Sequence, residues 1–196
     1  QRIIPGFDDH MYTFDAYLDQ NSKVSHWITC QKLRQFPINY GASVYTIHKQ
    51  VPELYEMGAK FLEDIGFKGF AEIEFKKDQD SGKYYLIEIN ARTTNLNSLI
   101  HKVGINMPYL AYCELTDKLT EPYTVEEDTN IAFWYAYEDF FAIRDYKRTK
   151  QLGRKEIIKS FNRKKAYAIW DIKDPLPFFA FIFQKAKGLF RKIYKR

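Results

Sequence analysis

Hydrophobic and polar positions alternate along two paired stretches of the chain. Residues 11–18 and 23–30 are rich in aromatic and β-branched side chains and are joined by turn-forming residues, so they predict a β-hairpin. Residues 69–77 and 83–90 show the same pattern around a short loop that ends in Gly82. Together the two hairpins predict a mostly antiparallel sheet.

The remaining hydrophobic positions mostly follow the period of an α-helix. Pro52 begins one helical stretch that continues to about Ile65. Residues 131–137 resemble a strand, while residues 31–45 have no clean period and are expected to form a loop. The other expected helices are 95–103, 107–117, 138–149, 154–161 and 176–196.

The character of the chain changes after Thr120, where the expected elements become mostly helical. We therefore expect an α+β fold in which a mostly antiparallel sheet is flanked by helices. This fold should occupy residues 1–118. Residues 119–196 should form a helical C-terminal extension that ends in a basic amphipathic helix.

Composition narrows the class of protein. The 196 residues are 45% hydrophobic and 17% aromatic, which is enough for a folded core. Cys30 and Cys113 are too few for a disulfide framework, so a reducing, cytoplasmic setting is expected. The net charge of +5 suits an anionic partner, but it does not choose among a nucleotide, a nucleic acid and an acidic membrane.

The start of the chain carries neither a secretory signal nor Met. Residues 1–6 read as the end of a strand that enters a turn. Nowhere does an apolar run reach the roughly 20 residues that span a bilayer. We therefore expect an upstream half of the same protein to precede Gln1.

The strongest candidate chemistry lies in the second predicted hairpin. Strand alternation places Glu72 and Glu74 on one face of its first strand. On its second strand, Glu88, Asn90 and Arg92 share one face. The loop length predicts a register in which Glu74 lies opposite Glu88. The same register brings Glu72 near Asn90.

Two carboxylates directly opposite each other destabilise a sheet unless their charge is compensated. A hard divalent cation bound by Glu74, Glu88 and Asn90 would compensate it, because Mg²⁺ typically takes one or two carboxylates plus substrate phosphates. Arg92 lies next along the same face and can bind phosphate oxygens bidentately. The alternative is a solvated polar face on which Lys76 and Arg92 neutralise the acids.

The hairpin resembles the metal-binding core of the ATP-grasp superfamily. In that family a strand with an acidic residue pairs with a strand that ends Glu-hydrophobic-Asn-x-Arg, as residues 88–92 do. The resemblance covers roughly residues 1–118 and includes residues 4–6, 32–37 and 104–108. It points to a branch of carboxylate–amine ligases similar to D-aspartate ligase and carbamoyl-phosphate synthase.

The resemblance implies the C-terminal subdomain of an ATP-grasp fold, with the upstream half absent from this sequence. It implies an enzyme that uses ATP and Mg²⁺ to join a small carboxylate to an amine, or to a thiol, through an acylphosphate. Two Mg²⁺ ions are expected, with Mn²⁺ as a substitute. This chain alone is expected to be inactive, because the phosphate-gripping lysines of the family belong to the missing half.

The resemblance also assigns roles to individual residues. Glu74, Glu88 and Asn90 match the Mg²⁺ ligands of the family, and Arg92 matches its phosphate-contacting arginine. Lys32 and Arg34 belong to a basic segment, and their alternation around Leu33 places both on the cleft as catalytic candidates. The alternative for that pair is two solvated surface cations.

Two other functions remain open. A metal-dependent nuclease would use Asp64, Glu74 and Lys76, but it leaves Asn90 and Arg92 without a role, and a nucleic-acid partner is therefore not expected. A non-catalytic fragment would use the basic helix at 176–196 to bind an anionic membrane surface or a protein partner. That helix could equally pack on its own domain. The scattered histidines His26, His48 and His101 are expected to be structural or solvent-facing. Asp15 lies on the first hairpin and could face the cleft, but a catalytic role is not expected for it.

Overall fold

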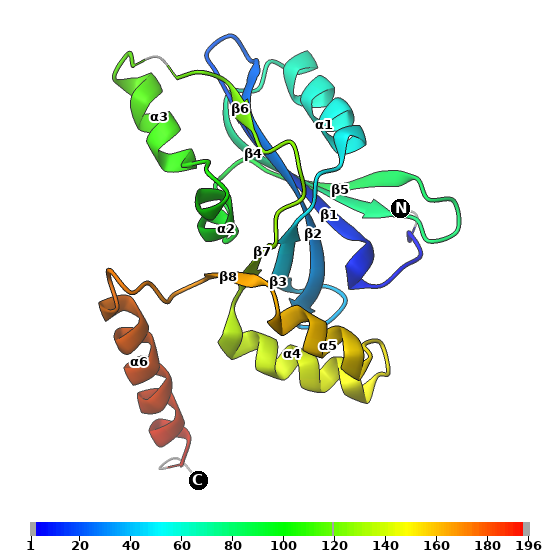
Figure 1. Ribbon diagram of the computed structural model, residues 1–196, viewed down its shortest axis with the longest axis vertical. Helices are drawn as coiled ribbons and strands as arrows, with labels where there is room; N and C mark the ends of the chain where they lie inside the picture. Colours follow the sequence, from blue (N-terminus) through cyan, green and yellow to red (C-terminus); the bar gives the residue numbers. More distant parts are fainter. Residues whose placement is uncertain (1–2, 119, 194–196) are drawn as a thin grey trace.

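The computed structural model describes residues 3–118 and 120–193, with side chains as far as Gly188. Its strands form one mixed sheet (Figure 1). They are β1 (Met11–Leu18), β2 (Val24–Phe36), β3 (Ala42–His48), β4 (Gly69–Lys77), β5 (Tyr84–Asn90), β6 (Tyr123–Thr124), β7 (Ile131–Trp134) and β8 (Lys164–Tyr167). The order across the sheet is β5-β4-β1-β2-β3-β7-β8, and β6 pairs with β2. All pairs are antiparallel except β7–β8 and β2–β6.

Helices cover both faces of this sheet. They are α1 (Pro52–Asp64), α2 (Asn97–Lys102), α3 (Met107–Leu115), α4 (Ala136–Arg148), α5 (Arg154–Phe161) and α6 (Leu176–Ile193), preceded by the 3-10 turn η1 (Asp8–His10). Pro52 occupies the first turn of α1, and Gly66 takes a φ of +68° just beyond its end, a conformation that favours glycine. The α+β class expected from the sequence is confirmed.

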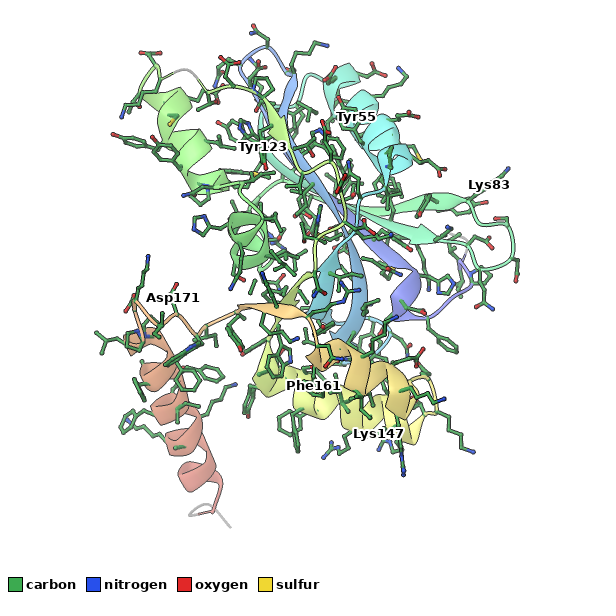
Figure 2. All side chains as sticks on the ribbon, in the orientation of Figure 1. Tyr55, Lys83, Tyr123, Lys147, Phe161 and Asp171 are labelled. Carbon is green, nitrogen blue, oxygen red and sulfur yellow. The ribbon has the colours of Figure 1, made fainter. Side chains whose placement is uncertain are left out.

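One face of the sheet packs against α1. Phe14, Ile73 and Phe75 of the central strands are almost fully buried against Leu54 and Leu62 of this helix. Tyr55 of the same helix is labelled in Figure 2. Its ring stacks on Trp27 of β2, with the ring centroids 4.3 Å apart. These contacts hold β1 and β4 side by side, and both strands carry polar side chains on their opposite face.

The opposite face packs against α2 and α3. Ile28 and Cys30 of β2 lie in a core with Leu96, Leu99 and Ile100 from the first of these helices and the residue before it. Because β1 is covered on both faces, all eight of its residues are buried. The polar residues of this face lie farther along the same strands, beyond the reach of the apolar core.

The C-terminal residues join the same sheet. β7 pairs with β3, β8 pairs with β7, and α4 packs on β2 and β3. The hydroxyl of Tyr45 on β3 donates to the Ser160 carbonyl of α5 at 2.5 Å. The division expected near residue 118 stays a prediction about domains, but residues on both sides of it share one sheet.

The last helix, α6, stands away from the sheet (Figure 1). Its Phe181 ring packs against Tyr137 of α4, with the centroids 5.4 Å apart, and Lys185 lies over the Tyr137 ring. In contrast, Phe179 and Phe183 are mostly exposed. None of the described helices has the length and apolar character needed to cross a membrane.

Most expected elements are present, and three differ. Residues 31–45 were expected to be a loop, but β2 continues to Phe36 and β3 begins at Ala42. The short strands β6 and β8 were not expected, because each has too few residues to show an alternating pattern. Of the expected terminal helix, residues 176–193 are helical, while residues 194–196 lie outside the described part of the chain, as do residues 1, 2 and 119.

Candidate functional site

A cleft of about 800 Å³ opens on the polar stretch of β4 and β5. Five of the six residues predicted for the site line it, namely Lys32, Glu74, Glu88, Asn90 and Arg92. They come from three strands that are far apart in the sequence and from the segment after β5. The sheet order β5-β4-β1-β2 brings them together.

The predicted register of the second hairpin is confirmed. Glu74 pairs with Glu88 and Glu72 pairs with Asn90. A β-bulge follows between Glu74 and Phe75, so the regular pairing is interrupted just beyond the two facing glutamates. The acids therefore lie at a point where the strands change their twist, which is common beside functional sites.

Lys32 supplies positive charge at this point. Its side chain is 4% exposed, and Nζ lies 2.5 Å from Glu74 Oε1. The contact arises because Lys32 of β2 and Lys76 of β4 both pair with Met11 of β1, which places Lys32 close to the middle of β4. The sequence analysis placed Lys32 in the cleft but did not predict this ion pair.

Asn90 connects the carboxylates to Arg92. Its Nδ2 donates to Glu72 Oε1 at 3.2 Å and to Glu88 Oε1 at 3.1 Å. Its Oδ1 accepts from Arg92 Nη2 at 3.1 Å. Arg92 Nη1 donates to the Thr93 carbonyl at 3.2 Å. Arg92 is exposed and lines the cleft, so its guanidinium is accessible to a phosphate or a carboxylate.

A second acid pair lies beneath the first. Asp15 of β1 pairs with Glu72 of β4, and the side chains of both residues are buried. Burial raises the pKa of Asp15 to about 6, although hydrogen bonds from Thr13 and Thr94 and the charge of Lys32 oppose the rise. Burial and the neighbouring Asp15 raise the pKa of Glu72 as well. The sequence allowed Asp15 to face the cleft, but its burial beside Glu72 was not predicted.

Arg34 does not face this cleft, and the expectation that it does is wrong. A β-bulge interrupts the pairing of β2 with β3 at Leu33 and Arg34, and this reverses the side on which the next residue points. Arg34 is buried, and its guanidinium carbon lies 4.1 Å from the centroid of the Tyr45 ring. The guanidinium binds Asp139 through Nε at 2.5 Å and Nη2 at 2.7 Å. Simple alternation around Leu33 fails because the sequence does not show the bulge.

The residues of the nuclease alternative are also separated. Asp64 ends α1, and it pairs with Lys60 on the exposed surface of that helix at 2.6 Å. Glu74 and Lys76 line the cleft on the other face of the sheet. The structure therefore does not assemble the three residues into one site.

The donor set of the cleft suits a hard cation that arrives with other ligands. Among the described residues, no group of three or more His, Cys, Asp or Glu side chains is arranged to hold a metal ion. Glu74, Glu88 and Asn90 offer two carboxylates and one amide. Mg²⁺ commonly takes one or two carboxylates and completes its six ligands with water and phosphate oxygens. This oxygen set therefore fits Mg²⁺ bound together with a nucleotide.

Comparison with known proteins gives an independent view of this geometry. Residues 38–110, which include β4, β5 and the facing glutamates, match the family model for the ATP-binding domain of the carbamoyl-phosphate synthase L chain. The D-aspartate ligase of Enterococcus faecium (strain Aus0004) is 30% identical over 109 residues. These matches support the ATP-grasp superfamily.

Two further ATP-grasp comparisons extend beyond the matched segment. The arginine-specific large chain of carbamoyl phosphate synthase from Geobacillus stearothermophilus is 28% identical over 152 residues, which is 74% of this chain. The biotin carboxylase of Campylobacter jejuni, solved as a complex with β,γ-ATP, has the same fold over 67% of this chain and 30% of its own. The TM-score of this pair is 0.53, and the sequence identity is 15%.

The matches cover only part of each relative. The alignment with the D-aspartate ligase spans 55% of this chain and 26% of the ligase. The alignment with the carbamoyl phosphate synthase spans 14% of that large chain. The family match and the fold therefore concern one segment of such enzymes.

Proposed function

We propose that the whole protein is an ATP- and Mg²⁺-dependent ligase that joins a carboxylate to an amine. A carboxylate oxygen of the first substrate attacks the γ-phosphorus of ATP, and ADP leaves. The amine nitrogen then attacks the acyl carbon, phosphate leaves, and the nitrogen loses a proton to solvent. A thiol in place of the amine would follow the same sequence. The observation that supports this proposal best is the cleft in which Glu74, Glu88, Asn90 and Arg92 meet.

The residues of the cleft have distinct roles in this proposal. Glu74, Glu88 and Asn90 would hold Mg²⁺. Two ions would be bound, and Mn²⁺ could replace Mg²⁺. The bound metal would neutralise the negative charge of the phosphates. Arg92 binds a phosphate oxygen or the developing acylphosphate. Lys32 holds the Glu74 carboxylate by an ion pair, which keeps one metal ligand in place before nucleotide binds.

Arg34 has a different role from that of the other cations. Its guanidinium is bound by Asp139 and is closed off from the cleft. We infer that Arg34 is a structural residue, which fixes β2 against α4 through Asp139. Removing Arg34 should therefore lower stability before it changes the contacts of the nucleotide.

Calorimetric titration of the full-length protein with Mg²⁺ and a non-hydrolysable ATP analogue tests the proposal. Glu88→Gln should weaken Mg²⁺-dependent binding by about tenfold or more, because one charged ligand is lost. Glu56→Gln makes the same change on the exposed surface of α1 and should leave binding unaltered. Equal nucleotide binding and turnover in wild type and Glu88→Gln would contradict the proposal.

Residues 1–196 by themselves are expected to bind nucleotide weakly and to lack turnover. The chain spans 26% of the D-aspartate ligase, so other parts of such an enzyme contribute to its activity. Adding a separately produced upstream half should restore turnover in this proposal. Full turnover by the chain alone would show that the cleft needs no second half.

A membrane contact through α6 is a second proposal. Helix α6 contains no Asp or Glu, and it exposes a set of large apolar side chains, namely Leu176, Phe179, Ile182 and Phe183. An apolar helix face with basic neighbours suits an anionic lipid surface. The cytoplasmic setting expected from the two free cysteines would allow such a contact, and it stays a prediction.

Sedimentation with vesicles that contain phosphatidylserine tests this contact. Replacing both Phe179 and Phe183 by Ser should abolish co-sedimentation, because each phenylalanine contributes burial of apolar surface. Phe61→Ser on α1 removes a partly exposed phenylalanine elsewhere and should have no effect. Binding that survives the double change, or that is absent from wild type, would overturn the proposal.

A further inference from the structure

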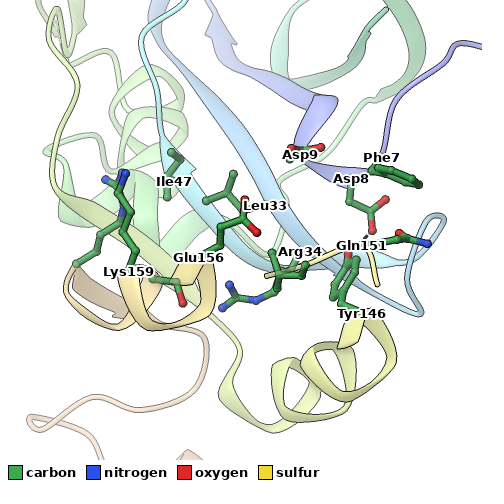
Figure 3. A pocket seen from close by; sticks show the side chains of 13 residues that line it. Phe7, Asp8, Asp9, Leu33, Arg34, Ile47, Tyr146, Gln151, Glu156 and Lys159 are labelled. Carbon is green, nitrogen blue, oxygen red and sulfur yellow. Dashed lines mark hydrogen bonds between the residues drawn. The ribbon is translucent and has the colours of Figure 1, made fainter. Parts of the chain in front are cut away.

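A second cavity is separate from the cleft, and Figure 3 shows the side chains that line it. It has a volume of about 280 Å³ and lies between β2, η1, the end of α4 and α5. This volume is close to the lower end of the range for small-molecule sites, about 300 Å³. The cavity therefore has room for a ligand of a few carbon atoms.

The walls of this cavity are partly apolar. Phe7, Leu33, Ile47 and Leu152 contribute the apolar surface. Two side chains with polar groups lie at different ends of the cavity in Figure 3, Lys159 on α5 and Gln151 in the loop before that helix. An apolar wall with a few convergent polar groups is typical of a small-molecule site.

The acids of the cavity already have hydrogen-bond donors. Asp8 accepts from Gln35 Nε2 at 2.8 Å, from the Asn39 amide at 2.9 Å and from the Tyr146 hydroxyl. Glu156 accepts from the Gly153 amide at 2.8 Å. Asp9 lies beside His10, whose Nδ1 is 2.8 Å away. These carboxylates therefore have little free capacity to bind a cation.

The cations of the cavity are not balanced in the same way. Arg34 is paired with Asp139, but Lys159 and Arg163 have no ion pair within the part of the chain that the structure describes. Burial lowers the pKa of nearby Lys165, and the charges of Arg34 and Arg163 lower it further. Lys159 and Arg163 therefore remain available to bind an anionic group.

One acceptor of the cavity is also without a partner. Gln151 Oε1 is buried, and it has no hydrogen-bond partner among the described residues. A buried polar atom without a partner costs free energy, so a ligand that donates a hydrogen bond to it would be favoured. The cavity thus offers cations at one end and an acceptor at the other.

We propose that this cavity binds a small organic anion that also carries a hydroxyl or amino donor. The anionic group, a carboxylate or a phosphate, is held by Lys159 and Arg163. The hydroxyl or amino group donates to Gln151 Oε1, and the carbon skeleton lies against Leu33 and Ile47. This site is separate from the ATP-grasp cleft and does not depend on the function proposed for it.

Titration calorimetry on the full-length protein tests the proposal with two probes, L-lactate and glycerol phosphate. At least one probe should bind saturably. Binding of lactate alone assigns the site to carboxylates, and binding of glycerol phosphate alone assigns it to phosphate esters. No saturable binding of either probe would overturn the proposal.

Variants locate the binding. Lys159→Gln and Arg163→Gln should each lower the affinity for the probe by about tenfold or more, because a charge-assisted hydrogen bond is removed. Lys155→Gln changes an exposed lysine of α5 outside the cavity and should leave the affinity unchanged. Glu88→Gln should also leave it unchanged, because the cleft is not involved. Lys159 is exposed, so replacing it should not impair folding. If Lys159→Gln and Arg163→Gln both bind the probe with wild-type affinity, these residues do not hold the anion, and the proposal is wrong.

Discussion

Glu74 lies directly opposite Glu88, and within the described residues only Glu74 has a cation in salt-bridge range. The Lys32 ammonium thus neutralises one member of the pair, while Glu88 accepts an amide hydrogen bond from Asn90 and has no other hydrogen bond to a side chain in residues 3–118 and 120–188. The metal-free site therefore keeps a residual repulsion. Binding of a cation would relieve it, and loss of the cation would restore it.

This repulsion predicts opposite effects of one substitution on stability and on binding. Glu88→Gln should raise the free energy of unfolding of the metal-free protein by about 0.5 kcal/mol, because one of two facing charges is removed. Denaturant unfolding in the presence of a chelator measures this change. If Glu88→Gln binds nucleotide weakly and yet unfolds at a higher denaturant concentration than wild type, its weak binding does not come from misfolding. A loss of stability would contradict the account of repulsion.

Removing Lys32 should have the reverse effect on stability. Lys32→Met leaves Glu74 without its cation beside the buried Glu72, so the free energy of unfolding should fall by about 3 kcal/mol at neutral pH. Lys76→Met removes a more exposed lysine from the same cleft and should cost less than about 1 kcal/mol. If both variants lose the same free energy of unfolding, the ion pair of Lys32 with Glu74 does not stabilise the fold more than an exposed lysine does.

The buried Asp15 predicts a pH dependence of stability. Its folded-state pKa of about 6 lies above the unfolded value of about 3.9, so the folded state binds the proton more tightly. Its contribution to stability is therefore complete below about pH 4 and is lost as the pH rises to about 6. In this window the free energy of unfolding should fall by up to about 1.4 kcal/mol per pH unit from this group.

Asp15→Asn tests this origin of the pH dependence. Asn keeps the shape of the protonated acid but cannot ionise, so the slope between about pH 4 and pH 6 should become shallower. Denaturant unfolding of metal-free protein at several pH values measures the slope. Asp64→Asn on the exposed end of α1 serves as a control and should leave the slope close to that of wild type. An unchanged slope in Asp15→Asn would assign the dependence to other groups.

The pair of Arg34 and Asp139 predicts a stability effect without a binding effect. Asp139→Asn leaves a buried guanidinium without its carboxylate, and the free energy of unfolding should fall by about 3–5 kcal/mol. Asp145→Asn on the same helix disturbs only longer contacts with Arg144 and Arg148, and it should cost less than about 1 kcal/mol. Below its unfolding temperature, Asp139→Asn should keep wild-type affinity for the nucleotide analogue. If folded Asp139→Asn loses much of its affinity for the nucleotide analogue, Arg34 contributes to nucleotide binding, and this prediction is wrong.

Two glycines in helices predict opposite responses to alanine. A Cβ at Gly58 of α1 would lie 2.4 Å from Cδ1 of the buried Phe14 ring, so Gly58→Ala should lower the free energy of unfolding by about 1–3 kcal/mol despite better helix propensity. Gly188→Ala in α6 meets no atom within 4 Å and should gain up to about 1 kcal/mol of local helix stability. Thermal unfolding followed by circular dichroism compares the two. Stabilisation by Gly58→Ala would show that Phe14 can move aside.

The sequence predicted the strand register well where regular alternation continues. The register of β4 and β5 followed from the period of two and the short loop, so Glu74, Glu88 and Asn90 could be placed in advance. Arg34 could not, because a bulge at Leu33 changes the face without any signal in the residues. Alternation cannot be extended safely through such an irregular segment.

Long-range contacts set a second limit to what the sequence could predict. The ion pair of Lys32 with Glu74 depends on the order of β2, β1 and β4 in the sheet, and this order follows from the packing of the whole domain. The burial of Asp15 has the same origin. The short strand β8 pairs only because β7 presents a free side to it, and its own sequence of Lys164, Lys165, Ala166 and Tyr167 shows no strand pattern.

The pairing of β7 with β3 affects how the protein can be shortened. Without the C-terminal residues, Tyr45, Thr46 and Ile47 would present unpaired backbone donors and acceptors along an exposed sheet edge. Such an edge can recruit a strand from another copy and begin aggregation. The C-terminal segment therefore protects the ATP-grasp sheet from self-association, and a soluble shortened protein should retain the chain through Tyr167.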